Sequence, residues 1–494
     1  MPSERRLHPA SILFLLGGQV REFLFPLALL IFGARSSDWG WQSWAALLLI
    51  PYSGLAVLRW LTLRWRCGEG ELVVRSGLVF RGERHVPLAR IQNLDAVQNP
   101  LHRLLRVVEV RVQTGAGAEP EAVLRVLRVA DFEELRQRVF AGRAAGTLAA
   151  GDAPAPPATR ELLRLSAGEL ALCGLVRNRG WLVIAAAYGL LWELGLQDRL
   201  QERVFGDAEA ARVEELVSGA SLLAGVALGV LAFVALLLLL RLFSMGWTLV
   251  RLHGFRLARV GEDLRTEFGL LTRVATTIPL RRIQTLTLQE GPLHRLTRRV
   301  SLRVGTAGGG AGEEKSAGRE WLAPILRRDA LPGLLCEVLP ELDLAAIAWQ
   351  PLHPRALRRR LKWAVIAALL LALPAVPLLG AWTPALGAAL LAWFALAALR
   401  GVALMGWAVT DDVVLYRSGW LWRETTIARV ARIQAVALHE SPFDRRHGHA
   451  GVHVDTAGAH AAAHHVRIPY LAREVADGLA RRLALAAAST EFRW

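Results

Sequence analysis

The chain has 494 residues, of which 53% are hydrophobic and 21% are charged, and its mean hydropathy is +0.32. This composition excludes a disordered protein and is unusually apolar for a soluble one, so it favours a membrane protein with substantial polar domains. Three widely spaced cysteines without a C-x-x-C pair argue against a disulfide scaffold and a cysteine-based zinc site. The formal net charge of +16 comes almost wholly from arginine, since Lys315 and Lys362 are the two lysines.

Uncharged segments long enough to cross a bilayer recur along the chain. In chain order, we predict spans beginning near Arg21 and then near 43–63, 180–197, 216–240, 363–380 and 384–405. The clearest is 216–240, because its 25 uncharged residues exceed the ~30 Å thickness of the hydrocarbon core at 1.5 Å per residue. Arg21 and Glu22 interrupt the first apolar run, so we interpret 9–20 as an interfacial segment. A cleaved signal peptide is the alternative there.

The charges beside these spans indicate their orientation. Arginines gather on one set of flanks, for example at Arg5, Arg177, Arg241 and Arg360, whereas loop 198–215 carries a net charge of −3, from three arginines and six acids. The positive-inside rule therefore places both termini and all large loops in the cytoplasm. The sequence predicts a multi-pass membrane protein whose large domains are cytoplasmic.

A polar segment follows each pair of spans, and the three segments match. Each contains a hairpin glycine, an Arg-Ile-Gln stretch, a second arginine in a Pro-x-x-Arg turn, and a threonine. These residues are Gly77, Arg90, Arg103 and Thr114; Gly269, Arg282, Arg295 and Thr306; and Gly419, Arg432, Arg445 and Thr456. The offset from glycine to first arginine is 13 in every copy, that between the two arginines is 13, and that from first arginine to threonine is 24. Equal offsets in three places identify three copies of one module.

Short apolar runs predict the strands of the module. In the first copy, Leu72–Arg75 and Leu78–Val86 flank a Ser-Gly turn, which is typical of a hairpin. Val107–Gln113 and Ala122–Val129 form a second such pair. Apolar residues at spacings of three and four, starting near Leu135, then predict a closing helix. We expect a small β-sandwich or barrel closed by that helix.

These motifs resemble the bacterial pleckstrin-homology (PH)-like domain of YdbS/YdbT-type membrane proteins. The resemblance rests on the Ser-Gly-Leu hairpin, the Pro-Leu-x-Arg-Ile-Gln stretch, the Pro-Leu-x-Arg-Leu turn and the Thr-Ala-Gly loop, and it covers nearly the whole chain. The third copy departs most, because Ala428-Arg429-Val430 replaces the Pro-Leu stretch and Arg446-His447 follows Arg445. The resemblance implies a PH-like fold and attachment to a bacterial plasma (inner) membrane, but no known reaction or ligand.

The expected fold class is membrane α plus β. It comprises about six transmembrane helices in three hairpins and three cytoplasmic PH-like β-sandwich or barrel domains, each closed by a C-terminal helix. In chain order we expect an interfacial segment and transmembrane pair 1 (1–64), PH-like domain 1 (65–141), an Ala/Pro-rich linker (142–179), transmembrane pair 2 (180–247), PH-like domain 2 (248–343), a basic linker and transmembrane pair 3 (344–406), PH-like domain 3 (407–486) and a tail (487–494).

Two arginines that recur in every module are the candidate site residues. They are Arg90 and Arg103, Arg282 and Arg295, and Arg432 and Arg445. One interpretation is a basic face that meets anionic lipid headgroups at the inner leaflet, at ~1 kcal/mol per arginine close to the surface. The other is structural: the arginines bind backbone carbonyls or acids and hold the turn between strands.

Two further patterns suggest chemistry only weakly. His447, His449 and His453 lie in the histidine-rich third module, but no cysteine or well-placed carboxylate completes a metal site, and a solvated loop is the preferred interpretation. The glycine-rich stretch 308–316 has Glu314 where a phosphate-binding loop needs glycine before its lysine. We expect no metal and no cofactor.

The sequence therefore predicts a non-enzymatic membrane protein whose modules bind membrane lipids with anionic headgroups, a membrane-protein partner, or another copy. The alternative is a transport or lipid-translocation component that the modules gate, although the spans contain few charged groups. Nucleic acid is not an expected partner, because the basic residues cluster beside the spans, where topology already requires them.

Overall fold

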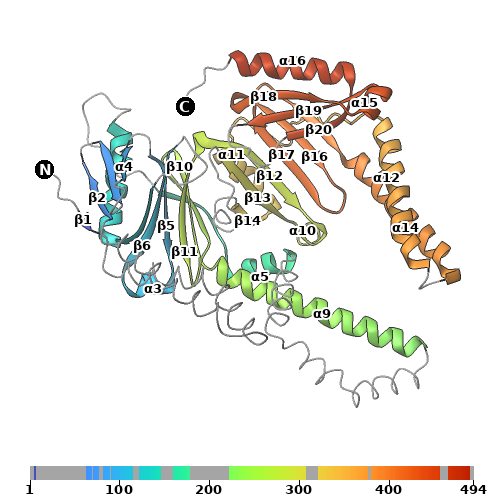
Figure 1. Cartoon of the computed structure of the whole chain (residues 1–494), viewed down its shortest axis with the longest axis horizontal. Helices are drawn as coiled ribbons and strands as arrows, with labels where there is room; N and C mark the ends of the chain where they lie inside the picture. The colour runs from blue at the N-terminus through green and yellow to red at the C-terminus, as the bar shows by residue number, and fades with distance from the viewer. Residues whose placement is uncertain are drawn as a thin grey trace, which may run out of the picture.

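The computed structural model describes residues 5–6, 63–68, 70–76, 82–88, 91–114, 122–145, 159–177, 222–306, 321–376, 380–456 and 466–489. Within these ranges the chain forms antiparallel sheets, with long helices that extend toward the lower right of Figure 1. The predicted interfacial segment 9–20 and the predicted spans near 43–63 and 180–197 lie outside the described residues. The three copies of the repeat are called modules 1, 2 and 3 below.

Module 1 contains two sets of strands followed by a helix. Its elements are β2 (Arg64–Cys67), β3 (Glu71–Ser76), β4 (Gly82–Pro87), β5 (Ile91–Gln98), α3 (Pro100–Leu104), β6 (Val107–Thr114), β7 (Ala122–Arg128) and α4 (Val129–Ala145). The short strand β1 (Arg5–Arg6) pairs with β2. Both predicted hairpins are confirmed: β3 pairs with β4 and β6 with β7.

Module 2 repeats this order. Before it lie β8 (Thr159–Arg164), α5 (Ala167–Val176) and the apolar helix α9 (Leu222–Arg251). The elements of the module are β9 (Arg256–Val260), β10 (Asp263–Phe268), β11 (Arg273–Pro279), η2 (Leu280–Arg282), β12 (Ile283–Glu290), α10 (Pro292–Leu296), β13 (Arg299–Thr306), β14 (Trp321–Arg327), η3 (Arg328–Ala330) and α11 (Leu331–Val338).

Module 3 follows a helical hairpin that consists of α12 (Arg355–Ala372), η4 (Leu373–Ala375), η5 (Gly380–Trp382) and α14 (Thr383–Leu404). The elements of the module are β15 (Gly406–Val409), β16 (Val413–Ser418), β17 (Arg423–Arg429), η6 (Val430–Arg432), β18 (Ile433–His439), α15 (Pro442–His447), β19 (His449–Thr456), β20 (Val466–Ala472) and α16 (Arg473–Ser489).

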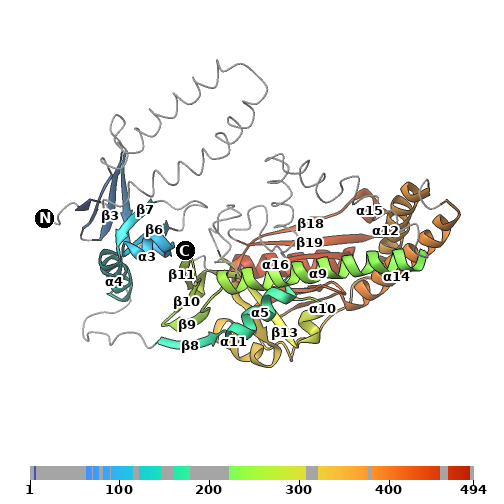
Figure 2. The same cartoon turned by 90° about the horizontal axis from the view of Figure 1, so that it is seen from below.

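The sheets do not stop at the module boundaries. One seven-stranded sheet has the order β7-β6-β5-β11-β10-β9-β8, and a six-stranded sheet has the order β14-β13-β12-β17-β16-β15. The Arg-Ile-Gln strand of one module thus pairs with the strand that follows the hairpin glycine of the next module, as β5 with β11 and β12 with β17 (Figures 1 and 2). Strands of neighbouring modules therefore belong to the same sheets. From the sequence we expected each module to form its own sandwich or barrel and did not predict this sharing.

The two junctions between modules have the same register. Gln98 pairs with Arg273, and Glu290 pairs with Arg423. The first residue of each pair lies eight positions after the arginine of its Arg-Ile-Gln stretch, and the second lies four positions after its hairpin glycine. Because a slip of one residue would turn every side chain to the opposite face, this identity indicates that the junction geometry is specified by the sequence.

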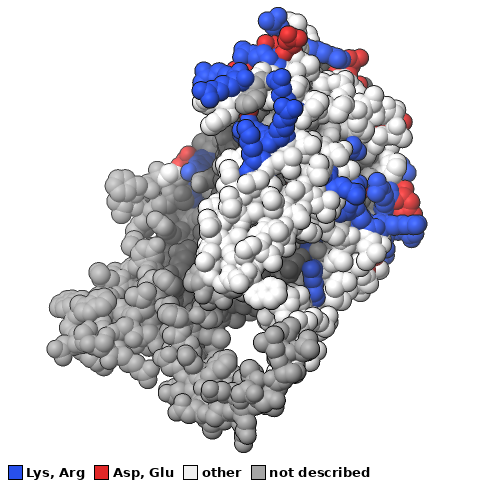
Figure 3. Space-filling model, turned by 90° about the vertical axis from the view of Figure 1, so that its right-hand side faces the viewer, with Lys and Arg blue, Asp and Glu red and all other residues white. Residues whose placement is uncertain are grey.

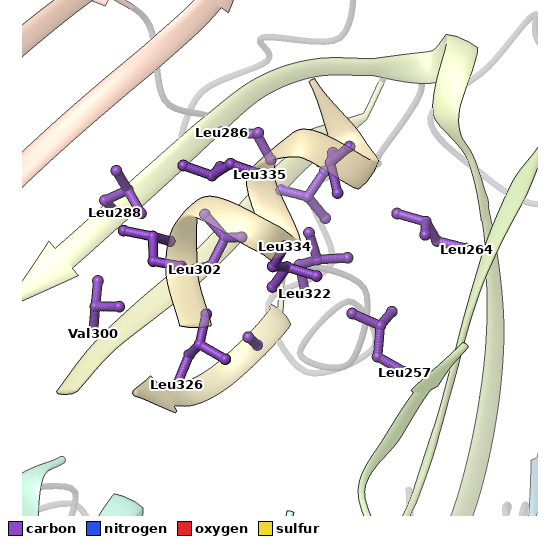
Figure 4. Packing of buried hydrophobic residues seen from close by; sticks show 14 of the residues in the cluster. Leu257, Leu264, Leu286, Leu288, Val300, Leu302, Leu322, Leu326, Leu334 and Leu335 are labelled. Carbon is purple, nitrogen blue, oxygen red and sulfur yellow. The ribbon is translucent and has the colours of Figure 1, made fainter. Parts of the chain in front are cut away.

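Apolar packing also crosses a junction. The largest buried cluster contains residues of module 2 such as Leu286, Leu302 and Leu335, together with Leu415 and Ile427 of module 3. Figure 4 shows Leu286, Leu302 and Leu335 converging between the strands and α11. Full burial of such a side chain contributes about 1.5–3 kcal/mol, so the outer face of one sheet of module 3 stabilises the core of module 2.

Two helices are long and apolar enough to cross a membrane within the described residues: Ala227–Arg251 and Gly380–Leu404. The predicted break near 380–384 is present, and α12 packs against α14 across it. Ala364, Ala368 and Ala372, at intervals of four on α12, are buried, which permits the close approach of helices typical of membranes. The predicted total of six spans is not confirmed, since the remaining spans lie mainly on residues outside those described.

We predict that Gly419→Ala destabilises the protein. Gly419 has φ +91°, and an added Cβ would lie 1.8 Å from the carbonyl oxygen of Trp422. Strain of this kind costs about 1–3 kcal/mol, which should lower the melting temperature of the detergent-solubilised chain. Gly478→Ala is the matched control, because that position in α16 has open space, and alanine there should stabilise by about 0.5–1 kcal/mol. Equal melting temperatures for the two variants would contradict this account of the hairpin.

Candidate functional site: module junctions and a basic helix face

Arg103 connects module 1 to the hairpin of module 2. It lies in α3, which begins at Pro100 directly after β5, and its Nη1 donates a 2.9 Å hydrogen bond to the backbone oxygen of Leu270. Leu270 follows the hairpin glycine Gly269. Beside this contact, the Oγ1 of Thr272 lies 3.0 Å from the Oδ1 of Asn99. The end of β5 is thus joined to the hairpin that precedes β11.

Arg295 makes the same connection between modules 2 and 3. Its Nη2 donates a 2.8 Å hydrogen bond to the backbone oxygen of Leu421, two residues after Gly419. The indole of Trp422 also lies against Gly291, where an added Cβ would be 3.3 Å from the ring. A hydrogen bond from a charged group contributes ~1.5–3 kcal/mol when shielded from water, and less when exposed. Arg103 and Arg295 therefore act as equivalent clasps at the two junctions.

Arg429 reinforces the second junction from the opposite side. Its Nη1 donates to the backbone oxygen of Leu280 at 3.3 Å, and its Nη2 donates to that of Val338 at 3.0 Å. The carboxylate of Glu341 lies 3.8 Å from the same guanidinium. Burial lowers the pKa of Arg429, Glu341 raises it, and Arg432 lowers it further. From the sequence we noted Arg429 only because the third module has Ala-Arg-Val where the other modules have Pro-Leu, and we assigned no role to this arginine.

The other four candidate arginines have different positions. Arg90 lies outside the described residues. Arg282 and Arg432 end the short turns η2 and η6 and are half-buried. Arg445, on α15, is exposed, and its side chain makes no hydrogen bond or ion pair with another described residue. Arg103 and Arg295 thus have the backbone partners of the structural interpretation, and lipid contact by the six arginines stays a prediction.

His294, the residue before Arg295, is buried in a fully occupied hydrogen-bond site. Ser301 Oγ donates to the oxygen of Pro324 at 2.7 Å, so it accepts the 3.0 Å hydrogen bond from His294 Nε2. The Nδ1 of His294 then accepts from the backbone N–H of Gly291 at 3.2 Å. A proton added at Nδ1 would face that N–H. Burial, with a smaller effect of Arg177, lowers the pKa of His294 to about 4.

A basic face lies at the start of the α12–α14 hairpin. Arg355, Arg358 and Lys362 are exposed on α12, and their spacings of three and four place them on one side of the helix. The exposed Trp363 follows directly, and the apolar part of the helix begins there. Figure 3 shows a broad surface without charged groups, with Lys and Arg gathered along its borders. Arg359 instead points toward module 3, where it pairs with Asp444 of α15.

The apolar helix α9 is fixed to module 2 near its basic end. Arg241 donates from Nη1 to the oxygen of Leu175 at 2.5 Å, and Ser244 Oγ donates to the oxygen of Gly174 at 2.8 Å. Gly174 is required for this approach, because an added Cβ would lie 2.5 Å from the Cα of Met245. The helix therefore passes from its exposed apolar part into the packed module without a flexible joint.

Three histidines of module 3 contact another histidine ring. The rings of His439 and His453 stack with centroids 5.5 Å apart, and His449 meets His353, which precedes α12, edge to face at 4.7 Å. Within the described ranges, no group of three or more His, Cys, Asp or Glu residues could hold a metal ion. The glycine-rich stretch 308–316 lies outside those ranges.

The sequence interpretation did not single out the histidine before the second arginine. His102 and His294 occupy this position in modules 1 and 2, both are buried, and Asp444 replaces them in module 3. The recurring Pro-Leu-His-Arg was the available signal. In each of modules 2 and 3 this residue accepts a hydrogen bond from the backbone at the start of the turn, Gly291 or Ser441.

Comparison with known proteins agrees with this architecture. The family model described as "Bacterial PH domain" matches residues 13–143, 212–329 and 356–487, and the chain belongs to this family. It is a PH-domain membrane protein of the YdbS/YdbT type. The chain is 24% identical over 464 residues to the UPF0699 transmembrane protein YdbT of Bacillus subtilis (strain 168). The aligned residues make up 90% of this chain and 91% of that protein. No solved structure matches the chain.

The lowered pKa of His294 predicts acid sensitivity. The unfolded chain binds a proton near pH 6.5 and the folded chain only near pH 4, so stability is full above pH 6.5 and falls as the pH decreases toward 4. The loss amounts to about 3 kcal/mol at most. Melting temperatures of the detergent-solubilised full chain between pH 7.5 and 4.5 measure it.

His294→Asn is the appropriate control variant. Its side-chain oxygen can accept from Gly291, as Asp444 accepts from Ser441 in module 3, but it does not titrate. We expect a flatter pH profile than that of the unmodified protein. An unchanged slope would assign the acid sensitivity to other groups.

Proposed function

We propose that this chain is a non-enzymatic integral membrane protein that holds its three PH modules against the cytoplasmic face of a bacterial plasma membrane, where they and the adjoining basic helix face bind anionic lipid headgroups. The proposal includes the full set of six spans in three pairs. In this proposal the modules have a binding role, and the side of the modules that faces the membrane binds the lipid headgroups.

The observation that carries this proposal is the direct connection between apolar helices and sheets. α9 ends at Arg251 and β9 begins at Arg256, while α14 ends at Leu404 and β15 begins at Gly406. Such short connections leave little room between membrane and module. Modules 2 and 3 must then lie within a few residues of the headgroups, where basic side chains are attracted to anionic lipids.

The distribution of charge supports the orientation. Arg355, Arg358 and Lys362 precede the apolar part of α12, and Arg400 lies near the end of α14 that joins module 3. Basic residues beside the ends of spans favour the cytoplasmic side. The apolar parts of both helices carry exposed residues such as Leu370 and Leu399, which need a hydrocarbon environment.

Selective association with anionic lipid is the first expected outcome. We expect Arg358→Gln combined with Lys362→Gln to reduce the preference of the reconstituted full chain for phosphatidylglycerol over phosphatidylcholine, measured with spin-labelled lipids. Each charge at the surface contributes ~1 kcal/mol, so a loss of roughly twofold or more is expected even after averaging over the whole lipid shell.

The matched control is Arg481→Gln combined with Arg482→Gln. These two exposed arginines lie on α16, outside the α12–α14 hairpin, and the double substitution removes the same amount of charge. We expect the control to keep the preference. An equal loss in both variants would indicate a general effect of net charge and contradict a lipid site on α12.

Cysteine labelling tests the orientation. Cys336 is exposed on α11, so in a Cys67→Ala, Cys173→Ala background a membrane-impermeant maleimide should label it only after the cells are permeabilised. Ala210→Cys, added to a background that also lacks Cys336, lies in the acidic loop and should react in intact cells. Labelling of Cys336 from outside would refute the cytoplasmic placement.

A further inference from the structure

Within the described residues, the series of junctions leaves one strand edge of module 1 and one strand edge of module 3 without a partner strand. β5 and β12 each pair with a strand of the next module, but β18, their counterpart in module 3, pairs within the described residues only with β19. Likewise β11 and β17 pair with the preceding module, whereas β4, their counterpart in module 1, pairs there only with β3. The two edges are thus complementary halves of the same junction.

The edge of β18 is exposed where its counterpart is buried. Leu288 of β12 is 7% exposed, and the equivalent Leu438 of β18 is 42% exposed. Thr287 is 1% exposed, whereas the equivalent Ala437 is open to solvent. The residues from Gln434 to Leu438 carry no charge, so β18 lacks the charged side chains that usually protect a sheet edge from pairing.

β4 of module 1 is the matching half. It is the strand that follows the hairpin glycine of its module, as β11 and β17 follow those of modules 2 and 3. β4 itself carries Glu83, Arg84 and His85, and these charges discourage indiscriminate pairing of its edge. The register sets Arg84 opposite the small Ala437, which leaves room for the longer side chain.

We propose that β18 of one copy pairs with β4 of a second copy in the register of the two internal junctions. In that register Val436 lies opposite His85. The contact is head-to-tail, so it generates a ring or an open row of copies. Each copy then contributes its three modules to a longer row in which every module pairs with the next. This assembly goes beyond the proposed binding of lipids.

Disulfide cross-linking in membranes tests the register. The full chain without native cysteines (Cys67→Ala, Cys173→Ala, Cys336→Ala) is prepared as Val436→Cys and as His85→Cys, with different tags, and the two are co-expressed and mildly oxidised. Opposed residues of antiparallel strands have Cβ atoms about 4.5–5.5 Å apart, close to the range that a disulfide needs. We expect a mixed dimer from this pair. Ala437→Cys with His85→Cys should give at least fivefold less, because position 437 faces the other side of the sheet.

Melting temperatures of all variants verify that they are folded.

Several results would overturn the proposal. Folded variants that give no mixed dimer would refute the contact. Cross-linking of Val436→Cys to itself would indicate symmetric pairing of two β18 edges instead. Cross-linking of Val436→Cys to a different protein, without a mixed dimer, would show that the edge serves another partner.

Discussion

The structure depends on one constraint: a β-strand at the edge of a sheet has unpaired backbone N–H and C=O groups that need partners. In this chain each Arg-Ile-Gln strand finds its partner in the following module, with the same register both times. The arginine clasps Arg103 and Arg295, the hairpin glycines and the turn before Arg295 are all positioned by that pairing. Packing follows it, because Ile427 can enter the core of module 2 only when β17 lies beside β12.

This constraint also relates the modules to the membrane. α9 and α14 run directly into the first strands of modules 2 and 3, and the strands of these modules are joined to one another. The two helices enter different sheets, α9 the seven-stranded sheet through β9 and α14 the six-stranded sheet through β15. Both sheets contribute side chains to the core of module 2, so movement of one helix relative to the other would disturb that core. Arg359 and Asp444 add a further connection between the α12–α14 hairpin and the turn that carries Arg445. Helices, sheets and clasps form one connected unit within the described residues.

Many elements of the module can be predicted from the sequence, because they are specified by residues close together in the chain. The glycine offsets predict the hairpins, and the break at Gly380 predicts the turn between α12 and α14. The pairing of β12 with β17 could not be predicted, since an apolar strand that closes a sandwich has the same alternation as one that pairs with another module. The roles of the arginines were ambiguous for a similar reason: equal spacing of Arg103 and Arg295 is required both by a ligand and by a backbone carbonyl. His294 was missed because its importance lies in burial, which no short motif records.

Identical registers at both junctions make the modules interchangeable building units. If a whole unit were gained or lost between one hairpin glycine and the next, the new neighbours would present edges that already fit. A deletion that begins or ends inside a module would instead leave backbone N–H and C=O groups of a strand unpaired. It would also expose the face of module 3 that carries Leu415 and Ile427. Variation in the length of such proteins should therefore proceed by entire repeats.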